Sequence, residues 1–376
     1  MATAALQDRR ATISIHPWSA WQQLAPIWSE LVAASGCCSF SLSETWVETW
    51  LQVFGPQLQP SVLIFESDRR AVGACLLANA KTMHGFLRIK RLSLNASGEA
   101  SADTTYSEYN DILCLPGWES AVTEALFEEL SSRKWDEIAL DGFSDGPVYR
   151  SLKEKFVGFE CEEVQHPSYY VDLVSIRESG IDFDMSLGKT SRKHLRQNIR
   201  HYSAIGDLRL EVAQNVPEAL TMLDEIARLS QMRWDSQGKR GIFSSERFYA
   251  FHRMLIEKSF SSGAVQLLRV LAGDQAVGLV YNLIQRGRVH FYQCGYHYGP
   301  DKRLSPGTVT LSRVIQYCLD EGYRDFDFLS GETSYKQSLS TGSRTLSWTV
   351  FRRPRLRLQA IDVLRRIKLQ LTQANN

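Results

Sequence analysis

Apolar and polar positions change period several times along the second half of the chain. Residues 289–296 and 324–329 are predicted to form β-strands, and residues 308–321 between them follow the 3.6-residue period of a helix. A strand, a helix and a strand of these lengths predict a parallel strand pair with a right-handed crossover, because a short turn cannot return the chain to the same edge. We expect the rest of the chain to be organised around this unit.

The loop before the predicted helix ends in Ser305-Pro306-Gly307. Proline suits the first turn of a helix, and glycine lets a ligand approach the backbone closely. Unpaired amides and the positive end of the helix dipole predict an anion site at this point. The alternative interpretation is an ordinary solvated helix start.

The order of predicted elements is repeated in the two halves of the chain. Strand pairs with tight turns are predicted at residues 61–77 and 264–284, each followed later by a helix and a strand. Three short pieces match in the same order: Val72-Gly73 with Val277-Gly278, Pro116-Gly117 with Pro306-Gly307, and residues 136–140 with residues 324–328. We interpret the repeat as a duplicated domain.

Further helices are predicted before and between the repeats, at residues 185–204, 217–236 and 245–260. In the tryptophan-rich segment 16–54, Ser43 is the expected N-cap of a helix on which Trp46 and Trp50 share a face, a spacing that favours core packing. The helix at residues 185–204 has Arg192, Arg196 and Arg200 four residues apart, so they line one face. That face is either solvated or an acceptor site for phosphate or carboxylate, which the guanidinium fork suits.

Composition limits the class of protein. The 376 residues are 44% apolar and 23% charged, which suits two globular domains, and the formal net charge of +1 argues against wholesale nucleic-acid binding. Seven cysteines without a CxxC pair or zinc spacing predict reduced thiols, with neither a disulfide framework nor a metal site. With no signal-peptide core and no bilayer-spanning apolar run, we expect a soluble, cytoplasmic protein.

The C-terminal tail departs from this charge balance. It holds seven basic residues against the single Asp362: Arg352, Arg353, Arg355, Arg357, Arg365, Arg366 and Lys368. A basic helix is expected here, with Ala360, Leu364, Ile367 and Leu371 on one stripe. This helix either docks on the domain or contacts an anionic membrane surface or glycan, which would place the protein at the inner face of the membrane.

A set of short motifs in the second half stands in a characteristic order. They are SRKHLRQNIR, Met232-x-Trp234, Val277-Gly278, YQCGY, SPG, FDFLSG and Tyr335-Lys336. Their order and spacing resemble the acetyltransferases associated with bacterial cellulose and exopolysaccharide biosynthesis, a branch of the GNAT superfamily related to the Fem peptidyltransferases. The resemblance covers roughly residues 165–345, and the first half only through the duplication.

The resemblance implies an α/β fold of tandem GNAT-like domains, each a mixed, mostly antiparallel sheet with a parallel, splayed strand pair, flanked by helices. The domains would be residues 1–175, without catalytic activity, residues 176–351, the acyltransferase with a helical insertion, and the basic helix 352–376. Acetyl-CoA or another acyl-CoA would lie between the splayed strands, with its pyrophosphate at the following helix N-terminus. By position, the cofactor-binding residues would be Gln293, Cys294, Gly295, Lys302, Arg303, Ser305, Gly307 and Thr308. The usual glycine-rich RxxGxG/A loop is absent, since Arg303 is followed by Leu-Ser-Pro-Gly and Pro306 supplies no amide.

Acyl transfer from a thioester to an amine needs an unprotonated nucleophile, donors for the oxyanion and a proton for the leaving thiolate. Amides of residues 293–295 are the expected oxyanion donors. Asp327, which projects opposite to its two phenylalanine neighbours, and Glu332 are candidate bases; Tyr335 is the candidate acid. The structural alternatives are surface carboxylates and a buried tyrosine, and His290 and His297 are weaker candidates.

The leading hypothesis is an acyl-CoA-dependent N-acyltransferase that acts on an amino sugar, sugar nucleotide or glycan, bound by Arg192, Arg196, Trp234 and Lys336. A Fem-type aminoacyl-tRNA-dependent transferase is the second, set lower because residues 205–262 lack the sustained heptads of that group's long paired helical arm. The third is a non-catalytic binding module, which is favoured if the splayed-strand site is blocked.

Overall fold

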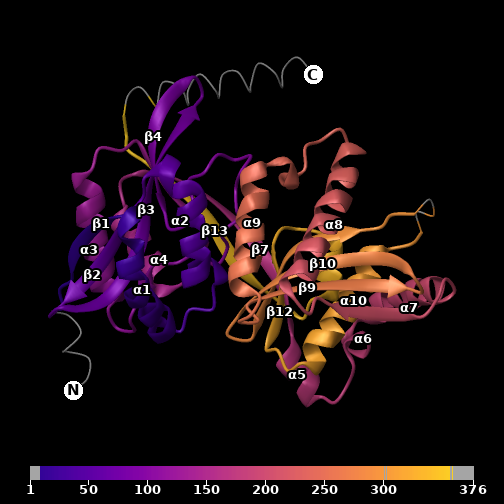
Figure 1. Ribbon diagram of the computed structural model, residues 1–376. Coiled ribbons are helices and arrows are strands. Elements are labelled where there is room, and N and C mark those ends of the chain that lie inside the picture. Colours follow the sequence, from indigo (N-terminus) through magenta and orange to yellow (C-terminus); the bar gives the residue numbers. More distant parts are fainter. Residues whose placement is uncertain (1–8, 300, 302, 356–357, 359–376) are drawn as a thin grey trace, which may run out of the picture. The chain divides into compact units, whose positions relative to one another are not determined.

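The computed structural model describes residues 9–299, 301, 303–355 and 358. The chain forms two compact units (Figure 1). The first contains residues 9–37, 41–165 and the described residues from 347 onward, and the second contains residues 38–40 and 166–346. Two strands, β7 (Glu160–Asp172) and β13 (Gly342–Arg352), contribute residues to both units. The boundary predicted at residue 175 lies in helix α5 (Leu173–Glu178) of the second unit.

The sheet of the first unit has the strand order β1-β2-β3-β4-β6-β13, and a short strand, β5, also pairs with β3. Its other strands are β1 (Thr12–Pro17), β2 (Ser61–Ser67), β3 (Arg70–His84), β4 (Leu87–Leu94), β5 (Leu113–Cys114) and β6 (Glu137–Ser144). The pairs up to β4 are antiparallel, and β4 and β6 are parallel. This is the mixed sheet that the sequence predicted.

Helices α1 (Trp21–Ser35), α2 (Glu44–Leu58), α3 (Glu119–Ser132) and α4 (Pro147–Lys155) complete the first unit. Ser43 is the N-cap of α2, as predicted, because its side chain accepts a hydrogen bond from the Trp46 amide. Trp46 and Trp50 are fully buried, which confirms their assignment to the core.

The sheet of the second unit has the order β7-β12-β11-β10-β9-β8. The strands that follow β7 in the chain are β8 (Leu208–Val212), β9 (Val265–Ala272), β10 (Gln275–Gln285), β11 (Arg288–Tyr296) and β12 (Asp325–Ser330). Neighbouring strands are antiparallel except for β11 and β12, which are parallel and are joined through α10 (Pro306–Asp320). The predicted strand, helix, strand unit is therefore confirmed.

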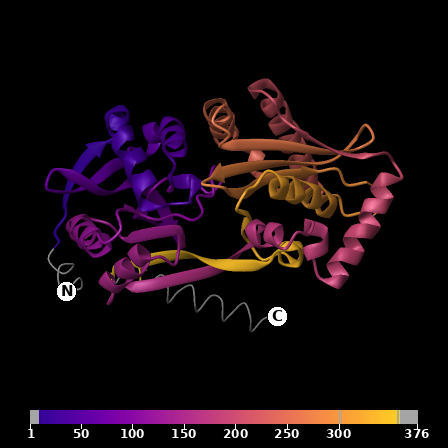
Figure 2. The same cartoon turned by 90° about the horizontal axis from the view of Figure 1, so that it is seen from below.

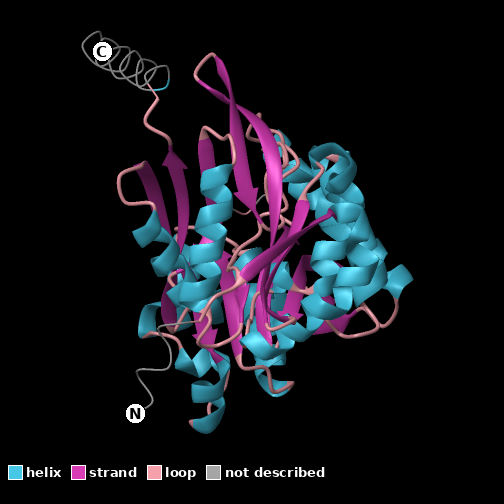
Figure 3. Ribbon diagram, turned by 90° about the vertical axis from the view of Figure 1, so that its left-hand side faces the viewer, coloured by secondary structure: helices cyan, strands magenta, loops and turns pink. Residues whose placement is uncertain are grey.

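The remaining helices of the second unit are α6 (Phe183–Ser186), α7 (Lys189–Ser203), α8 (Val216–Asp235), α9 (Glu246–Ser259) and α11 (Ser334–Leu339). A side chain added at Gly295 would meet Ile226 and Leu229 of α8, whereas one added at Gly278 would meet Thr310 of α10. Because neighbouring positions along β11 face opposite sides, α8 and α10 cover opposite faces of this sheet (Figure 2). Figure 3 shows helices packed beside the strands. The core between the sheet and α10 is built from Val309, Val314 and Ile315 against Val280 and Phe326.

The helix predicted at residues 185–204 is shorter in the structure. Leu187 and Gly188 have extended backbone angles, so the helix begins only at Lys189. Asn215 and Ser245 cap α8 and α9, and the bounds of those two helices agree with the prediction to within one residue.

The first residues of the basic tail pair with carboxylates of the first unit, two of which, Asp136 and Glu137, are buried. Arg352 pairs with Glu137 (2.6 Å) and Glu162 (2.7 Å), Arg355 pairs with Asp136 (2.7 Å), and Arg353 donates to backbone carbonyls. The rest of the predicted tail helix lies outside the described residues, apart from Leu358. Across the part of the chain that the structure describes, no helix has the length and apolarity needed to cross a bilayer.

The buried histidines of the second unit predict an acid-sensitive fold. His252 is fully buried between Phe248, Tyr281 and Tyr292, and burial lowers its pKa to about 3. Since the unfolded pKa is about 6.5, the unfolded chain binds the extra proton below that pH, and stability falls as the pH falls from about 6.5 towards 3. We expect His252 to remove about 2 kcal/mol of unfolding free energy between pH 7 and pH 5.

Urea unfolding at a series of pH values measures this loss. The His252→Gln variant should lose less stability on acidification than the parent, whereas His194→Gln, at an exposed position of α7, should follow the parent curve. An identical acid response of His252→Gln and the parent would contradict the prediction.

Candidate functional site

The two parallel strands of the second unit pair only over a short stretch. The register joins Arg288 to Asp325 and ends where His290 meets Asp327. Beyond that point β11 continues against β10, and β12 continues against β7 up to the Ser330–Ser168 pair. The strands therefore separate into a fork, formed by residues 293–296 on one side and 328–330 on the other. This is the splayed pair that the sequence predicted.

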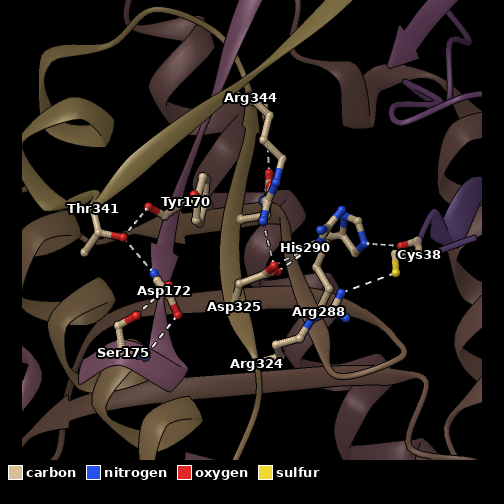
Figure 4. Close-up of polar contacts among 12 residues, drawn as sticks. Cys38, Tyr170, Asp172, Ser175, Arg288, His290, Arg324, Asp325, Thr341 and Arg344 are labelled. Atoms are coloured by element: carbon tan, nitrogen blue, oxygen red, sulfur yellow. Dashed lines mark hydrogen bonds and ion pairs between the residues drawn. The ribbon is translucent and has the colours of Figure 1, made fainter. Parts of the chain in front are cut away.

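A buried ionic network holds the closed end of the fork (Figure 4). Arg344 from β13 donates to Asp327 and Asp325, each at 2.8 Å, and Arg288 donates to Asp325 at 2.9 Å. His290 contacts the Cys38 carbonyl at 3.1 Å, and burial lowers its pKa to about 4. A fully paired network of this kind fixes the register at which the two strands separate.

Asp327 lies at the centre of this network and is 0% exposed. Besides Arg344, it accepts hydrogen bonds from the Ser168 hydroxyl (2.7 Å) and the Leu329 amide (2.8 Å). It is therefore a buried carboxylate, not a surface one, and its lone pairs are already engaged. Glu332, the other candidate base, is exposed and follows Gly331, whose φ of 119° favours glycine. The catalytic role of either carboxylate stays a prediction.

Lys336 on α11 binds backbone carbonyls at the end of β12 that lies at the open side of the fork. Its buried ammonium donates to the Leu329 carbonyl (3.2 Å) and the Ser330 carbonyl (2.6 Å). The lysine thereby ties α11 to the strand end and places its neighbour Tyr335 beside the fork. The predicted binding of an acceptor by Lys336 would have to use the same ammonium group that donates to these two carbonyls.

Aromatic hydroxyls gather around Cys294 in the fork. Burial, with the neighbouring Cys294, raises the pKa of Tyr335 above its usual range. Burial also raises the pKa of Tyr296, whose hydroxyl lies beside the Cys294 thiol and finds no other hydrogen-bond partner among the described residues. Arg233 of α8 donates to the Tyr298 hydroxyl at 2.7 Å at the edge of this group. Both tyrosines therefore remain protonated at neutral pH.

Tyr296, Tyr298 and Arg233 were missed by the sequence prediction. The two tyrosines lie in the segment YQCGYHY, which drew attention only as part of a motif. Side chains alternate along a strand, so residue 296 lies on the same face of β11 as Cys294. The sequence could therefore have predicted that Tyr296 is a neighbour of Cys294. Arg233 offered no signal, because its partner Tyr298 lies 65 residues away.

The start of α10 closes one end of the candidate donor site. Ser305 is its N-cap, and the Ser305 amide donates to Asn198 of α7 at 2.7 Å. Gly307 faces the ring of Tyr296, since a Cβ at this glycine would lie 3.1 Å from it. Thr308 follows in the first turn. Lys302 lies outside the described residues, and the exposed Arg303 forms a bidentate pair with Asp301.

The predicted acceptor residues lie on α7 and α8. Arg192, Arg196 and Arg200 line one hollow of about 670 Å³ together with Lys189, Lys193 and Gln197. Arg192 donates to the Leu187 carbonyl (3.0 Å), so part of its capacity is used within the protein. Trp234, near the end of α8, packs against Gly241 and Lys239. A role for these residues in acceptor binding stays a prediction.

The corresponding fork of the first unit is filled by the chain itself. There β4 and β6 pair from Arg91–Glu137 to Ser93–Ala139 and then separate. Asn110 occupies the opening: it forms a parallel bridge with Phe143, and its side chain donates to the Leu94 carbonyl (3.4 Å) and the Asp141 carbonyl (3.1 Å). Among the described residues of the second unit, no such bridge enters the fork.

One family model matches part of the second unit. Residues 189–337 match the model described as the acetyltransferase (GNAT) domain, so this segment is similar to such a domain. The segment contains the fork, α10 and most of α11. The repeated element order in the first unit makes the whole a tandem GNAT-like fold.

Solved structures show the same fold. FemX aligns with a TM-score of 0.56 at 10% identity, over 86% of this chain and 95% of that one. L-PGS from Bacillus licheniformis aligns with a TM-score of 0.53 at 13% identity, over 91% and 95%. The C-terminal domain of a putative lysylphosphatidylglycerol synthetase from Agrobacterium fabrum gives 0.52 at 10% identity, over 92% and 95%. No curated protein matches the sequence.

Proposed function

We propose that the chain is an acyl-CoA-dependent N-acyltransferase, with acetyl-CoA as donor and an amino sugar, sugar nucleotide or glycan as acceptor, in bacterial exopolysaccharide biosynthesis. The observation that carries the donor assignment is the fork of the second unit, which no strand of the described chain fills. Beyond His290, that edge of β11 has no strand partner among the described residues, so its amides suit a pantetheine arm and a developing oxyanion.

The residues present fit the donor. Residues 293–295 would line the arm. Gly307 and Thr308 at the start of α10 would receive the pyrophosphate through their amides, because helix N-termini bind anions, whereas the Ser305 amide already donates to Asn198 and only its hydroxyl could contribute. The protonated hydroxyl of Tyr296 lies beside Cys294, and Cys294 also raises the pKa of Tyr335, so either phenol would supply the proton for the leaving thiolate. Within the described residues no group of side chains is suited to hold a metal ion.

The two alternatives receive less support. A binding module without catalysis suits the first unit, where Asn110 blocks the fork, better than the second. For a Fem-type transferase, the likeness to FemX concerns the fold. Helix α8 lies on the sheet, where Ile226 and Leu229 contact Gly295, and this placement differs from a projecting paired arm.

Calorimetric titration with acetyl-CoA tests the donor assignment. We expect one molecule bound per chain, because only one of the two forks is open. Arg303→Ala should weaken binding several-fold with little loss of stability, since the exposed Arg303 side chain contacts Asp301 and not the core.

Arg209→Ala is the matched control, because Arg209 is another exposed arginine of the second unit paired with an aspartate, Asp274. It should bind acetyl-CoA like the parent. Absence of any heat of binding at millimolar acetyl-CoA would remove the acyltransferase proposal, and a stoichiometry of two would show that the first unit also binds the donor.

A further inference from the structure

A separate cavity of about 640 Å³ lies entirely within the first unit. Its walls are the middle of β3, the second half of β4, the end of α2 and the long segment between β4 and β5. Sites for small molecules generally measure about 300–1,000 Å³, so the volume is suitable. We call this space the loop cavity, after residues 96–107 that form much of its lining.

The charges around the loop cavity are balanced and partly used within the protein. Lys81 and Arg91 line it together with Glu99 and Asp141. Arg91 already pairs with Glu137 at 2.6 Å. Glu99 accepts hydrogen bonds from the Trp50 indole (3.2 Å) and from the Thr105 amide (2.8 Å). A phosphate or nucleotide would therefore find little uncompensated positive charge.

The uncharged part of the lining is rich in hydroxyl and amide groups. It includes Asn79, Thr82, Ser97, Ser101, Thr104 and Ser107. Of these, Ser97 and Ser107 already donate to the Leu94 and Ala96 carbonyls, at 3.1 and 2.7 Å, and keep only their acceptor capacity. Two aromatic side chains, Tyr106 and Trp348, complete the lining. Aromatic rings with a polar edge offer apolar contact area next to hydrogen-bonding groups.

Two features of the cavity wall are unexplained by the fold alone. Ser93 is 1% exposed, yet its hydroxyl has no hydrogen-bond partner among the described residues, and such groups are costly unless something satisfies them. Gly98, with a φ of 106°, packs closely against Ser93, because a Cβ there would lie only 3.2 Å from the Ser93 hydroxyl.

The second feature is Tyr106, which has a φ of 48° and is 51% exposed. A bulky residue in the left-handed region is strained, and strain of this kind concentrates at functional sites. Because about half of the Tyr106 surface is exposed, burial of the ring offsets little of this strain.

We propose that the loop cavity binds a saccharide. A pyranose ring has hydroxyl groups around its edge and apolar C–H groups on its faces, which match the hydroxyl-rich lining and the two aromatic rings. An added hydroxyl would also satisfy the Ser93 oxygen. The cavity lies in the first unit, whose fork is blocked by Asn110. Saccharide binding would therefore be a function of the first unit that is separate from the acyl transfer proposed for the second unit.

Ligand-observed saturation-transfer NMR on the full chain tests the proposal, with glucose, cellobiose and N-acetylglucosamine as probes and without acyl-CoA. We expect transfer to at least one sugar at millimolar concentration. Tyr106→Gly should weaken its binding at least tenfold while leaving the melting temperature unchanged or higher, because glycine relieves the left-handed strain. If Tyr106 had only a structural role, its replacement would not weaken sugar binding while leaving the melting temperature unchanged or higher.

Ser93→Ala is the second variant and should weaken binding several-fold, since it removes the buried hydroxyl. Phe86→Ala, which removes an exposed aromatic ring of the first unit away from the cavity lining, should bind like the parent. No saturation transfer to any of the three sugars would overturn the proposal. So would parent-like binding in both Tyr106→Gly and Ser93→Ala, because the sugar would then bind elsewhere. Acetyl-CoA titration is a separate measurement, and either proposal can fail alone.

Discussion

Asp327→Asn is expected to lower the free energy of unfolding of the second unit by about 3 kcal/mol. The substitution removes the negative charge from one member of a buried ion pair, so that the Arg344 guanidinium keeps its pair with Asp325 but loses the one with Asp327. It also weakens the bonds from Ser168 and the Leu329 amide, which together fix the end of β12. Urea unfolding followed by circular dichroism measures the loss.

Glu332→Gln provides the matched control, because it removes the same charge from an exposed carboxylate five residues further along the chain. Its stability should stay within about 0.5 kcal/mol of the parent. The pair also separates structure from chemistry. If Asp327→Asn were as stable as Glu332→Gln and yet lost turnover, Asp327 would act as the base and its structural role would be secondary.

The parts of the fold predicted from sequence are those governed by local periodicity. The β9–β10 hairpin, α8, α9 and the β11-α10-β12 crossover all follow from apolar spacing and from turn or capping residues. The duplication was visible because the Val-Gly and Pro-Gly pairs recur in the same order in both units. These predictions depend only on residues close together in the sequence, and not on contacts between distant residues.

The parts that local sequence could not predict depend on distant contacts. Alternation along β12 indicates that Asp327 opposes its phenylalanine neighbours, but its partner Ser168 lies 159 residues away. Nothing in the local sequence around Asn110 shows that this side chain will close the fork between β4 and β6. The local sequence around Lys336 likewise does not show that the carbonyls of residues 329 and 330 lie beside its ammonium. Burial and pairing, not residue type, decide these roles.

Tyr335→Phe is expected to lower kcat by about a hundredfold or more while the affinity for acetyl-CoA changes little. Burial holds the pKa of this tyrosine above its usual range, so the phenol keeps its proton at neutral pH and can give it to the leaving thiolate. Activity that depends on this acid should be present below its raised pKa and be lost only as the pH rises through it. Release of the CoA thiol in the presence of an amino sugar acceptor, such as glucosamine, measures turnover, and calorimetry measures donor affinity.

Tyr296→Phe decides which tyrosine is the acid. The Tyr296 ring packs against Gly278 and Gly307, and phenylalanine keeps that packing, so this variant should fold like the parent. The Tyr296 hydroxyl lies beside the Cys294 thiol, and Cys294 also raises the pKa of Tyr335. Both tyrosines are therefore candidates for the acid. If Tyr335 is the acid, Tyr296→Phe should keep most of its turnover. The reverse result, with Tyr335→Phe active and Tyr296→Phe inactive, would move the proton donor from α11 to β11. Full activity in both single variants and in the variant that carries both substitutions would show that neither phenol protonates the thiolate.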